Sequence, residues 1–560
     1  MSALKCLQAF KASFQSAQTN VGTNVRRFLC YKTQPSGLVC YLEGHKAPEK
    51  EQFFLFTMIV WILGVLVFPV LLLLVYQYLY LIRRNPKGPL PLPFLGNTFS
   101  IRNVPRWEDK FVEWKKDYGP IFTFYSGLLP MVTVNDYDLI QQMFVKDGDT
   151  YADRFKFKDF NKVMRGGEYG IVGTDGALWR EQRRFVLKTL RDFGMNKNLM
   201  QERILEEFQT LCSKVNDELA SGVAEIDFHK FTSIAVGSVI NSLLNGYRFT
   251  TNSNEEEFYK LRESAEKMMK SFADPLMIIA VTSKLFRKLP IVKQRLEKSV
   301  GYARDIFDFL ERVIDKHIEQ NDYENMQEPS DLIDAFMMEK TKLDKTEEAH
   351  HYSKLQLINV NLDLWLAGHE TTSATITWGI AYMITNPEVQ EKLHGEIDRE
   401  IGSDRLITVA DKQKLTYLNA VIMEVQRCAN IIALNQLRVT NKPIELNGVT
   451  VAKGTIVLPM ISTLMADEKI YAQPKKFNPE RFIDENGKLK RSDEMMPFSV
   501  GKRQCPGENL ARQELYLLLA NIFNHYKFTA GKQAPSLLKE HNGASMGTQP
   551  YNCRIERRFP

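Results

Sequence analysis

The residues best suited to chemistry lie near the C-terminus, in the segment Phe498 to Glu508 with the sequence Phe-Ser-Val-Gly-Lys-Arg-Gln-Cys-Pro-Gly-Glu. Its cysteine, Cys505, stands just before apolar residues at helical spacing, which predict a helix over 509–526. Backbone N–H groups and the positive end of the helix dipole would stabilise a thiolate there. Two glycines allow the backbone to approach a large flat group, and Arg503 places a cation beside the cysteine.

A thiolate, a close backbone approach and a cation are what a cysteine ligand to haem iron requires. A single cysteine, considered alone, is more often a buried apolar residue. The surrounding pattern, Phe-x-x-Gly-x-Arg-x-Cys-x-Gly, begins at Phe498 and has its first glycine at Gly501. It should arise by chance in fewer than about one chain in ten thousand.

This pattern resembles the cysteine motif of the cytochrome P450 family, the haem-thiolate monooxygenases, and the resemblance extends from about Gly88 to the end of the chain. It implies the family's fold, which is mainly helical with a smaller β portion. It also implies a haem b cofactor with Cys505 as axial ligand, and places Phe498, Gly501 and Arg503 at that cofactor.

Further cations are expected at the haem propionates. Trp179 and Arg183 are four apart on a predicted helix and share a face. They match the family's Trp-x-x-x-Arg motif, which implies that both hold a propionate, together with Arg503 and Arg438. The sequence departs from the family over 430–438, where many relatives carry prolines above the haem and none occurs here. The backbone before Arg438 is therefore expected to be less rigid.

A long helix is predicted over Leu355 to Thr385, and its middle is Ala-Gly-His-Glu-Thr-Thr, from Ala367 to Thr372. Small residues leave room for a ligand, and hydroxyls that bond backward are expected to loosen the helix. An acid beside a hydroxyl is a pair suited to proton delivery. The family's Ala-Gly-x-Glu-Thr motif matches, which implies Gly368 at the haem, Thr371 stabilising bound dioxygen and Glu370 in the proton relay.

The residue between the glycine and the acid, His369, occupies the family's variable position, and we expect it to be structural or exposed. Another helix, predicted over Leu415 to Arg427, carries Glu424 and Arg427 three apart. Such pairs are usually weak surface contacts. The family's Glu-x-x-Arg and Pro-Glu-Arg-Phe motifs match, however, and imply that Glu424, Arg427 and Arg481 form a structural cluster that supports the cysteine loop.

The helix of Trp179 also carries a basic stripe, which consists of Arg180, Arg184, Lys188 and Arg191. Their spacing puts them on one edge of the helix. That edge is either a solvated face or the docking surface of an acidic electron-donor protein, and the spacing does not separate the two.

The N-terminal part divides into three segments. Residues 1–52 are basic and expected to be disordered, with an organelle presequence as the alternative. Residues 53–82 carry no charge and are long enough for a transmembrane anchor. Residues 83–97 form a basic, proline-rich hinge, and 98–560 the catalytic domain. More basic residues follow the anchor than precede it, which predicts an endoplasmic reticulum protein whose catalytic domain faces the cytosol, in preference to a mitochondrial one.

Composition agrees with a large intracellular domain. The net charge is +6 over 560 residues, and the basic residues are dispersed among acids, which argues against nucleic-acid binding. The cysteines show neither a disulfide framework nor a zinc spacing. They are Cys6, Cys30, Cys40, Cys212, Cys428, Cys505 and Cys553.

Other elements follow from local pattern and from alignment to the microsomal branch. A β-hairpin is expected around Ile121–Phe124 and Met131–Val134, and a polar surface loop over Lys340–His351. The pocket for a lipophilic substrate is expected from five mostly apolar segments. These are Phe155–Val172, Pro275–Val281, Leu364–Ala367, Ile431–Asn435 and Ser545–Gln549.

The predicted function is a membrane-anchored monooxygenase acting on a fatty acid, sterol or xenobiotic. Electrons would come from NADPH through a separate cytochrome P450 reductase, with cytochrome b5 as a further partner, because the chain has no Gly-x-Gly-x-x-Gly dinucleotide motif. Three alternatives stay open: a peroxide-rearranging relative, against which the pair Glu370-Thr371 argues, a haem-binding sensor or carrier without turnover, and a membrane interaction protein without haem.

Overall fold

The computed structural model describes most of the chain downstream of residue 82 and a smaller part upstream. The described range 82–559 has gaps at 94, 103, 105, 194–197, 251–253, 273, 275, 278–279, 281–285, 347 and 543–544. Upstream, the described residues are 28–33, 37–42 and scattered positions between 57 and 80. The chain divides into two compact units, Met1–Leu81 and Ile82–Pro560.

The first unit contains one pair of strands. β1 (Phe28–Thr33) and β2 (Gly37–Leu42) are antiparallel, and Phe28 lies opposite Leu42. The pair falls within the extension expected to be disordered. Most of the expected membrane anchor, 53–82, lies outside the described residues. Among the residues that are described, no helix has both the length and the apolar character needed to cross a membrane.

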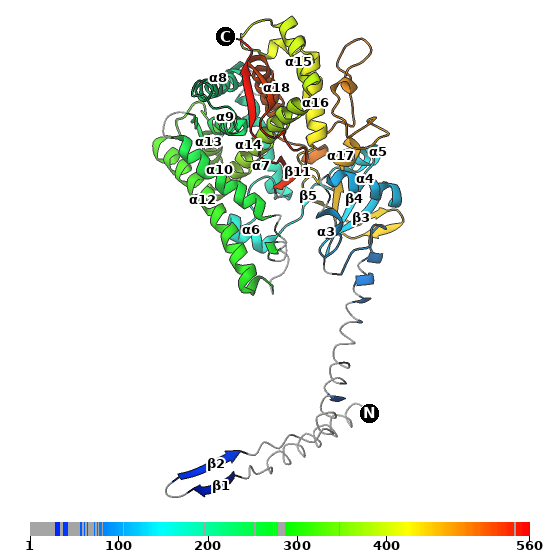
Figure 1. The fold of residues 1–560 in the computed structure, drawn as a ribbon. Helices are drawn as coiled ribbons and strands as arrows, with labels where there is room; N and C mark the ends of the chain where they lie inside the picture. The colour runs from blue at the N-terminus through cyan, green and yellow to red at the C-terminus, as the bar shows by residue number, and fades with distance from the viewer. Residues whose placement is uncertain are drawn as a thin grey trace. The chain divides into compact units, whose positions relative to one another are not determined.

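The second unit is mainly helical (Figure 1). The α-helices among its described residues are α3 (Thr98–Arg102), α4 (Trp107–Tyr118), α5 (Tyr137–Ile140), α6 (Lys158–Arg165), α7 (Gly176–Asp192), α8 (Asn198–Ala220), α9 (Phe228–Asn245), α10 (Asn254–Ser271), α12 (Pro290–Gln320), α13 (Leu332–Asp344), α14 (Lys354–Thr385), α15 (Pro387–Glu400), α16 (Thr416–Ala429), α17 (Ile461–Met465) and α18 (Glu508–His525). Short 3-10 turns are η2 (Phe286–Lys288), η3 (Val409–Asp411), η4 (Pro479–Phe482) and η5 (Gly501–Arg503), and η1 (Gln141–Lys146) is a π-helix.

The β portion is smaller and centres on a five-stranded sheet of order β3-β4-β9-β6-β5. Its strands are β3 (Ile121–Ser126), β4 (Leu129–Val134), β5 (Asp153–Arg154), β6 (Arg438–Val439) and β9 (Ile456–Pro459). The expected hairpin is confirmed as β3–β4. Three strand pairs complete the set: β7 (Ile444–Leu446) with β8 (Val449–Val451), β10 (Tyr526–Ala530) with β13 (Cys553–Arg557), and β11 (Lys539–Asn542) with β12 (Ser545–Thr548).

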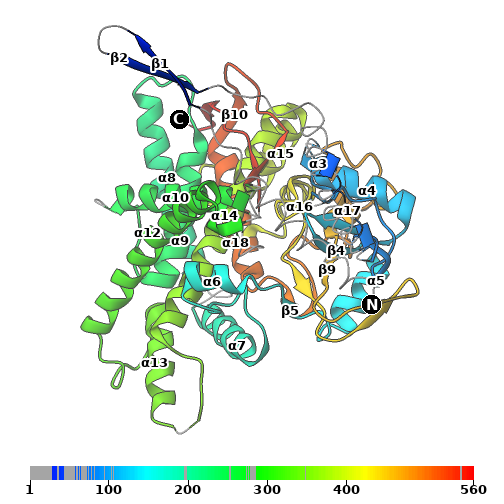
Figure 2. The same ribbon diagram turned by 90° about the horizontal axis from the view of Figure 1, so that it is seen from below.

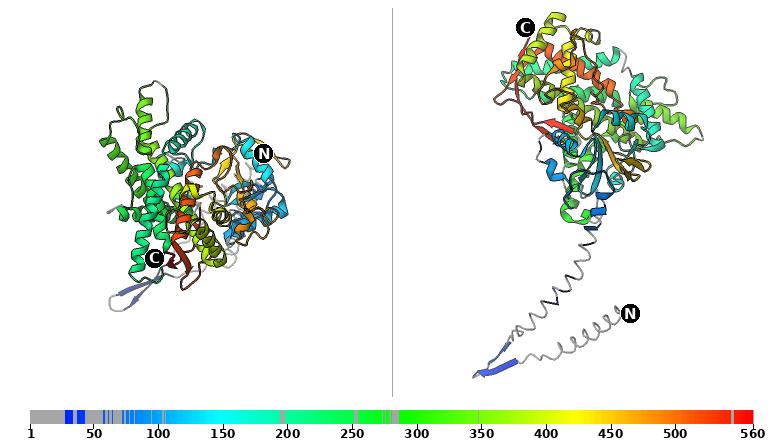
Figure 3. Two further views of the ribbon diagram at one scale, coloured as in Figure 1. Left: turned by 90° about the horizontal axis from the view of Figure 1, so that it is seen from above. Right: turned by 90° about the vertical axis from the view of Figure 1, so that its right-hand side faces the viewer.

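The sheet and the helices occupy different sides of this unit. Figure 2 shows β4, β9 and α3–α5 on one side and α8, α9, α10, α12 and α13 on the other, and the left view of Figure 3 shows the same division between blue and green segments. Between them α14 packs against α9, α12, α16 and α18. Because helices surround α14, most of its side chains are buried, including Trp365 and Trp378. The sequence placed α14, α16 and α18 within about two residues of their ends.

One predicted loop is partly wrong. The polar segment Lys340–His351 was expected on the surface as a loop, but α13 continues through Lys340 to Asp344. The helix is anchored by the buried Phe336, and Lys340 forms an ion pair with Asp344 one turn later. Pairs at this spacing support a polar helix that hydrophobic periodicity alone does not reveal.

The predicted structural cluster is confirmed. Glu424 and Arg427 of α16 are fully buried, and the guanidinium group holds both carboxylate oxygens at 2.7 and 2.8 Å. Arg481 of η4 donates to the same carboxylate at 3.1 Å, and so does the backbone N–H of Asn478 at 2.8 Å. The cluster therefore ties α16 to η4, upstream of the cysteine loop. Bidentate geometry and complete pairing make such a buried pair stable.

Removing the charge of Glu424 should destabilise the fold. Glu424→Gln would leave the Arg427 guanidinium buried without its anion, at a cost of about 3–5 kcal/mol in the free energy of unfolding. The matched control is Glu480→Gln, because Glu480 lies on η4 but pairs only with Lys392 at the surface. That change should cost about 1 kcal/mol or less. Thermal unfolding of both variants tests this; equal unfolding temperatures for Glu424→Gln and the parent would contradict it.

Candidate functional site

One cavity gathers most of the residues that the sequence singled out. It has a volume of about 280 Å³ and is lined by α7, α9, α14, the end of α16, the cysteine loop and α18. Of the predicted site residues, those on its wall are Trp179, Arg183, Gly368, Thr371, Arg438, Phe498, Arg503 and Cys505. Gly501 and Glu370 do not line it.

The cysteine loop is fixed by its own backbone and by a neighbouring helix. The N–H of Cys505 donates to the carbonyl of Phe498 at 2.9 Å, which closes the loop. Gly501 has φ +68°, and a Cβ there would lie 1.8 Å from the carbonyl oxygen of Phe144. Only glycine permits this approach. Gly501 therefore supports the loop from behind and does not contact the cavity.

The thiol of Cys505 opens onto the cavity just before α18, whose N-cap residue is Gly507. The surroundings of this thiol match the expected thiolate-stabilising environment only in part. Burial raises the pKa of Cys505, although the N–H of Gly507 and the charge of Arg183 favour the thiolate. A bound metal cation would favour the thiolate further.

Four guanidinium groups meet at the cavity wall: Arg154, Arg183, Arg438 and Arg503. Arg154 of β5 lies directly opposite Arg438 of β6 in the strand pair. Like charges in this position repel. Arg503 stacks on Trp179, with its guanidinium carbon 3.7 Å from the ring centroid. Sequence reasoning missed Arg154, which stands outside the family motifs quoted above.

The polar partners of these four groups are neutral. Arg503 donates to the carbonyls of Ala152 and Thr174, each at 2.6 Å. Arg438 donates to the hydroxyl of Ser499 at 2.8 Å and to the carbonyl of Val500 at 2.9 Å. Arg183 and Arg154 likewise donate to backbone carbonyls. Within the described part of the chain, none of the four forms an ion pair with a carboxylate.

This arrangement has an electrostatic cost. Burial and the repulsion of neighbouring guanidinium groups lower the pKa of Arg438 to about 9 and that of Arg503 to about 8, with Asp175 opposing the shift at Arg503 only in part. Buried charges in proteins are normally paired. The residues present therefore fit a planar ligand with two carboxylates at this edge and a metal near Cys505, which is the chemistry of haem with its propionates.

The missing prolines do not displace Arg438. Asn430 and Asn435 adopt left-handed backbone conformations, with φ of 41° and 56°, and the side chain of Asn435 donates to the carbonyl of Pro459 at 2.9 Å. Asparagine tolerates this conformation better than most residues. The two asparagines thus shape the segment that many relatives shape with prolines, and β6 holds Arg438 at the cavity.

The middle of α14 separates the predicted proton-delivery pair. Thr371 faces the cavity, and its hydroxyl donates backward to the carbonyl of Ala367 at 2.7 Å, as expected. The helix nevertheless stays continuous through this region, so the expected loosening is absent from these described residues. Glu370 lines a different, polar cavity with His229 and Ser233. Adjacent helical residues point about 100° apart, which explains the separation.

The substrate-pocket segments are confirmed in part. Those that contribute to the cavity wall do so through Ile171, Val172, Leu364, Ala367, Ile431, Ile432 and Asn435. Ser545, Gly547 and Thr548 instead line the polar cavity of Glu370. Pro275–Val281 falls partly outside the described residues, and its described members do not line the Cys505 cavity. The sequence alone does not show on which side of α14 each segment lies.

Two contributions to the cavity were not anticipated. Ile240, Leu243 and Leu244 of α9 form part of its apolar wall. Glu514 of α18 also lines it and is almost completely buried, and burial raises its pKa to about 8. An acid within the apolar face of α18 was visible in the sequence, and it was the available signal for Glu514.

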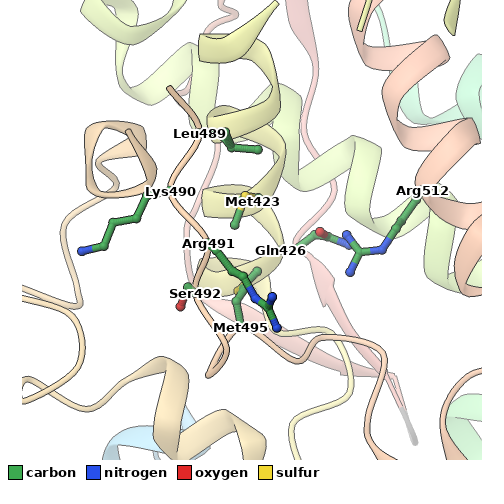
Figure 4. A pocket seen from close by; sticks show the side chains of 8 residues that line it. All are labelled: Met423, Gln426, Leu489, Lys490, Arg491, Ser492, Met495 and Arg512. Carbon is green, nitrogen blue, oxygen red and sulfur yellow. The ribbon is translucent and has the colours of Figure 1, made fainter. Parts of the chain in front are cut away.

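The outer side of the cysteine loop carries further cations. A surface pocket of about 270 Å³ lies between α16, the segment 489–495 and α18. Figure 4 shows Arg512 reaching from α18 toward Gln426 of α16, with Arg491 on the other side of the pocket. The guanidinium carbon of Arg512 lies 4.8 Å from the ring centroid of Phe498. On α7, all four residues of the basic stripe are exposed, and no ion pair involves them within the described part of the chain.

Comparison with known proteins agrees with this site. A family model described as "Cytochrome P450" matches residues 86–555. Cytochrome P450 2J5 of Mus musculus is 34% identical over 497 residues, which cover 87% of this chain and 96% of that protein. Cytochrome P450 2H2 of Gallus gallus is 34% identical over 448 residues, which are 79% of this chain and 87% of the relative. Cytochrome P450 2A6 of Homo sapiens is 32% identical over 468 residues, covering 83% and 92%.

The similarity begins at the proline-rich segment and continues almost to the last residue, so it includes the cysteine loop, α14 and the arginines of the cavity. A match over most of the chain, at this identity to several relatives, shows that the chain belongs to the cytochrome P450 family of haem-thiolate monooxygenases.

Proposed function

We propose that this monooxygenase inserts one oxygen atom from O2 into a lipophilic small molecule, with Cys505 as the haem ligand. One observation carries the assignment of the site: Cys505, Thr371 and four guanidinium groups without anions share one cavity. Haem, when bound, supplies the oxygen-activating chemistry, and the protein supplies the ligand, the anion partners and the pocket.

Each predicted site residue has a role in this proposal. Cys505 would supply the thiolate ligand. Arg183, Arg438 and Arg503, joined by Arg154, would bind the propionates, and Trp179 supports Arg503 by stacking. Gly368 and Phe498 form part of the wall, and Gly501 allows the loop to approach Phe144. Gly368 also allows α14 to pack closely on Ile240 of α9, since a Cβ would lie 2.7 Å from that side chain.

The substrate should be lipophilic. Alongside the cations and polar side chains, many aliphatic side chains line the cavity, chiefly from α9, α14, α18 and the segment after α16. Such a lining binds by burial of apolar surface, with few polar groups to orient the ligand. Fatty acids, sterols and xenobiotics all satisfy this requirement, and we propose no finer class.

Electrons should arrive from NADPH through a separate cytochrome P450 reductase, with cytochrome b5 as a second partner. The exposed stripe Arg180, Arg184, Lys188 and Arg191 supports this proposal, because an acidic partner would be attracted to it. The uncharged segment 53–82 supports a membrane anchor at the endoplasmic reticulum, with the catalytic domain in the cytosol where NADPH is available.

Proton delivery is tested by Thr371→Ala. The hydroxyl of Thr371 is one of three threonine hydroxyls of α14 at the cavity and the one that belongs to the Ala-Gly-x-Glu-Thr motif. Its loss should lower product formed per NADPH, with the missing electrons recovered as hydrogen peroxide. A positioned proton donor contributes typically about 10²–10⁴-fold, although water can replace part of this. Product, NADPH consumption and peroxide are measured together with added reductase and a lipophilic substrate.

The control is Thr385→Ala, because Thr385 makes the same backward hydrogen bond, to Ala381, at the distant end of α14. Its product per NADPH should match the parent. Unchanged coupling in Thr371→Ala would remove Thr371 from the mechanism, and absence of any NADPH consumption in the parent would favour a sensor or carrier.

Donor docking is tested by reversing two charges of the stripe, Arg184→Glu with Lys188→Glu. Exposed charges act over a Debye length of about 8 Å at physiological salt, so the main effect should be on association rate. Reductase-driven turnover should fall and become less sensitive to salt. Turnover driven by added peroxide requires no donor and should be nearly unchanged. Equal loss in both assays, or no loss in either, would exclude the docking role.

A further inference from the structure

Two cysteines of the first compact unit, Met1–Leu81, occupy facing positions in neighbouring strands. β1 (Phe28–Thr33) and β2 (Gly37–Leu42) are antiparallel, and their register places Cys30 directly opposite Cys40. Residues directly opposite each other in an antiparallel pair have Cα atoms about 4.5–5.5 Å apart. A disulfide joins residues whose Cα atoms are about 4.4–6.8 Å apart. The backbone register therefore suits a disulfide between these two positions.

The sequence supports this strand pairing independently. The two strands have the sequences Phe-Leu-Cys-Tyr-Lys-Thr and Gly-Leu-Val-Cys-Tyr-Leu, in which phenylalanine, tyrosine, valine and threonine are residue types that favour strands. Between them the chain carries Gln34, Pro35 and Ser36, and proline and serine are typical of turns. The spacing of the seven cysteines does not by itself indicate a pair, so the strand register is the observation that joins Cys30 to Cys40.

The strand pair has little other support. Among the described residues, β1 and β2 form a two-stranded sheet of their own. An isolated two-stranded hairpin is at best marginally stable in water. Small units that cannot build a large apolar core commonly use disulfides instead. A covalent link between the strands would restrict the unfolded chain and so stabilise the paired state.

The place of these strands along the chain determines their redox environment. They precede the uncharged segment 53–82, which we propose as the membrane anchor, and the catalytic domain follows it. If the chain crosses the membrane once and the catalytic domain is cytosolic, residues 1–52 lie in the lumen of the endoplasmic reticulum. The lumen is oxidising, whereas cytosolic thiols are kept reduced. The described cysteines of the second unit are free, as a cytosolic domain requires.

We propose that Cys30 and Cys40 form a disulfide in this lumen, so that the strand pair is a covalently closed unit. The inference goes beyond the proposed function and rests on the proposed anchor and its orientation. The reaction is a thiol–disulfide exchange with a lumenal disulfide oxidant: the thiolate of one cysteine attacks the oxidant, and the thiolate of the other displaces it from the mixed disulfide. The two cysteines lose two protons and two electrons, and the oxidant leaves as two thiols.

The first test is peptide mapping of the full-length protein in isolated membranes. Free thiols are blocked with N-ethylmaleimide, and the protein is digested with trypsin without reduction. Cleavage after basic residues gives the peptides 28–32 and 33–46, each of which contains one of the two cysteines. Mass spectrometry should find these peptides joined, lighter than their sum by two hydrogen atoms, and separate after reduction. Absence of both peptides from the mature protein, as removal of a presequence would cause, would overturn the proposal.

The matched control exchanges two neighbouring residues of β2, Val39→Cys with Cys40→Val. This variant keeps the composition of the chain and moves the cysteine by one register position, so that it lies opposite Tyr31 and no longer opposite Cys30. Neighbouring positions of a strand belong to opposite faces of the sheet, and the joined peptides should therefore be lost. Equal cross-linking in the parent and the control, or a link from either cysteine to Cys6, would overturn the pairing.

The second test locates the disulfide. In sealed vesicles, a charged phosphine reductant that does not cross membranes should leave the two peptides joined, and the same reductant should separate them once detergent is added. Reduction in sealed vesicles would overturn the lumenal location.

NADPH consumption is measured on the same membranes with added reductase and a lipophilic substrate. Free thiols at both positions in protein that turns over would overturn the disulfide and leave the monooxygenase proposal intact. A disulfide in protein without turnover would support the disulfide and contradict the proposed function.

Discussion

The structure depends on a cluster of arginine side chains that lack anionic partners among the described residues. Arg154 and Arg438 face each other across β5 and β6, and Arg183 and Arg503 join them at the same cavity without a carboxylate among the described residues. Arg438 and Arg503 are buried, and Arg154 and Arg183 are half-buried. Cations held only by carbonyls and a hydroxyl in such surroundings are costly, because removing water from a charge carries a large free-energy penalty. Such a group is stable when an anion is bound. We therefore regard the apoprotein as a fold prepared for a dianionic ligand.

The remaining features can be understood from this constraint. The cysteine loop must approach the same ligand, so it is closed by a hydrogen bond to Phe498 and packed onto Phe144 at a position only glycine can occupy. The buried cluster at Glu424 fixes α16 relative to η4. α14 spans the molecule as one continuous helix and puts Thr371 and Glu370 on different sides. Two cavities are thus lined by different sides of one helix.

Much of the fold and of the candidate site could be predicted from the sequence, and the predictions that failed did so for identifiable reasons. Cys505, Arg503 and Trp179 lie in short motifs whose spacing reflects the geometry of one ligand, so they could be found without a structure. The helices α14, α16 and α18 have strong apolar periodicity and clear ends. Arg154 could not be found, because its role depends on pairing with β6, which is distant in sequence. The separation of Glu370 from Thr371 follows from the 100° between adjacent helical residues, so the sequence did contain that signal. The side of α14 on which Ser545, Gly547 and Thr548 lie depends on tertiary packing. The helical Lys340–Asp344 lacks an apolar repeat.

The central claim is that Cys505 is the thiolate ligand, and the absorption spectrum of the reduced protein with carbon monoxide tests it most directly. The account predicts the long-wavelength band typical of thiolate ligation in the parent. Cys505→His should lose that band while still binding haem, because the arginines that hold the propionates are unchanged. Cys428→Ala, which alters a buried cysteine that does not line the cavity, should keep the band. A thiolate band that persists in Cys505→His would contradict the account, since a different cysteine would then be the ligand.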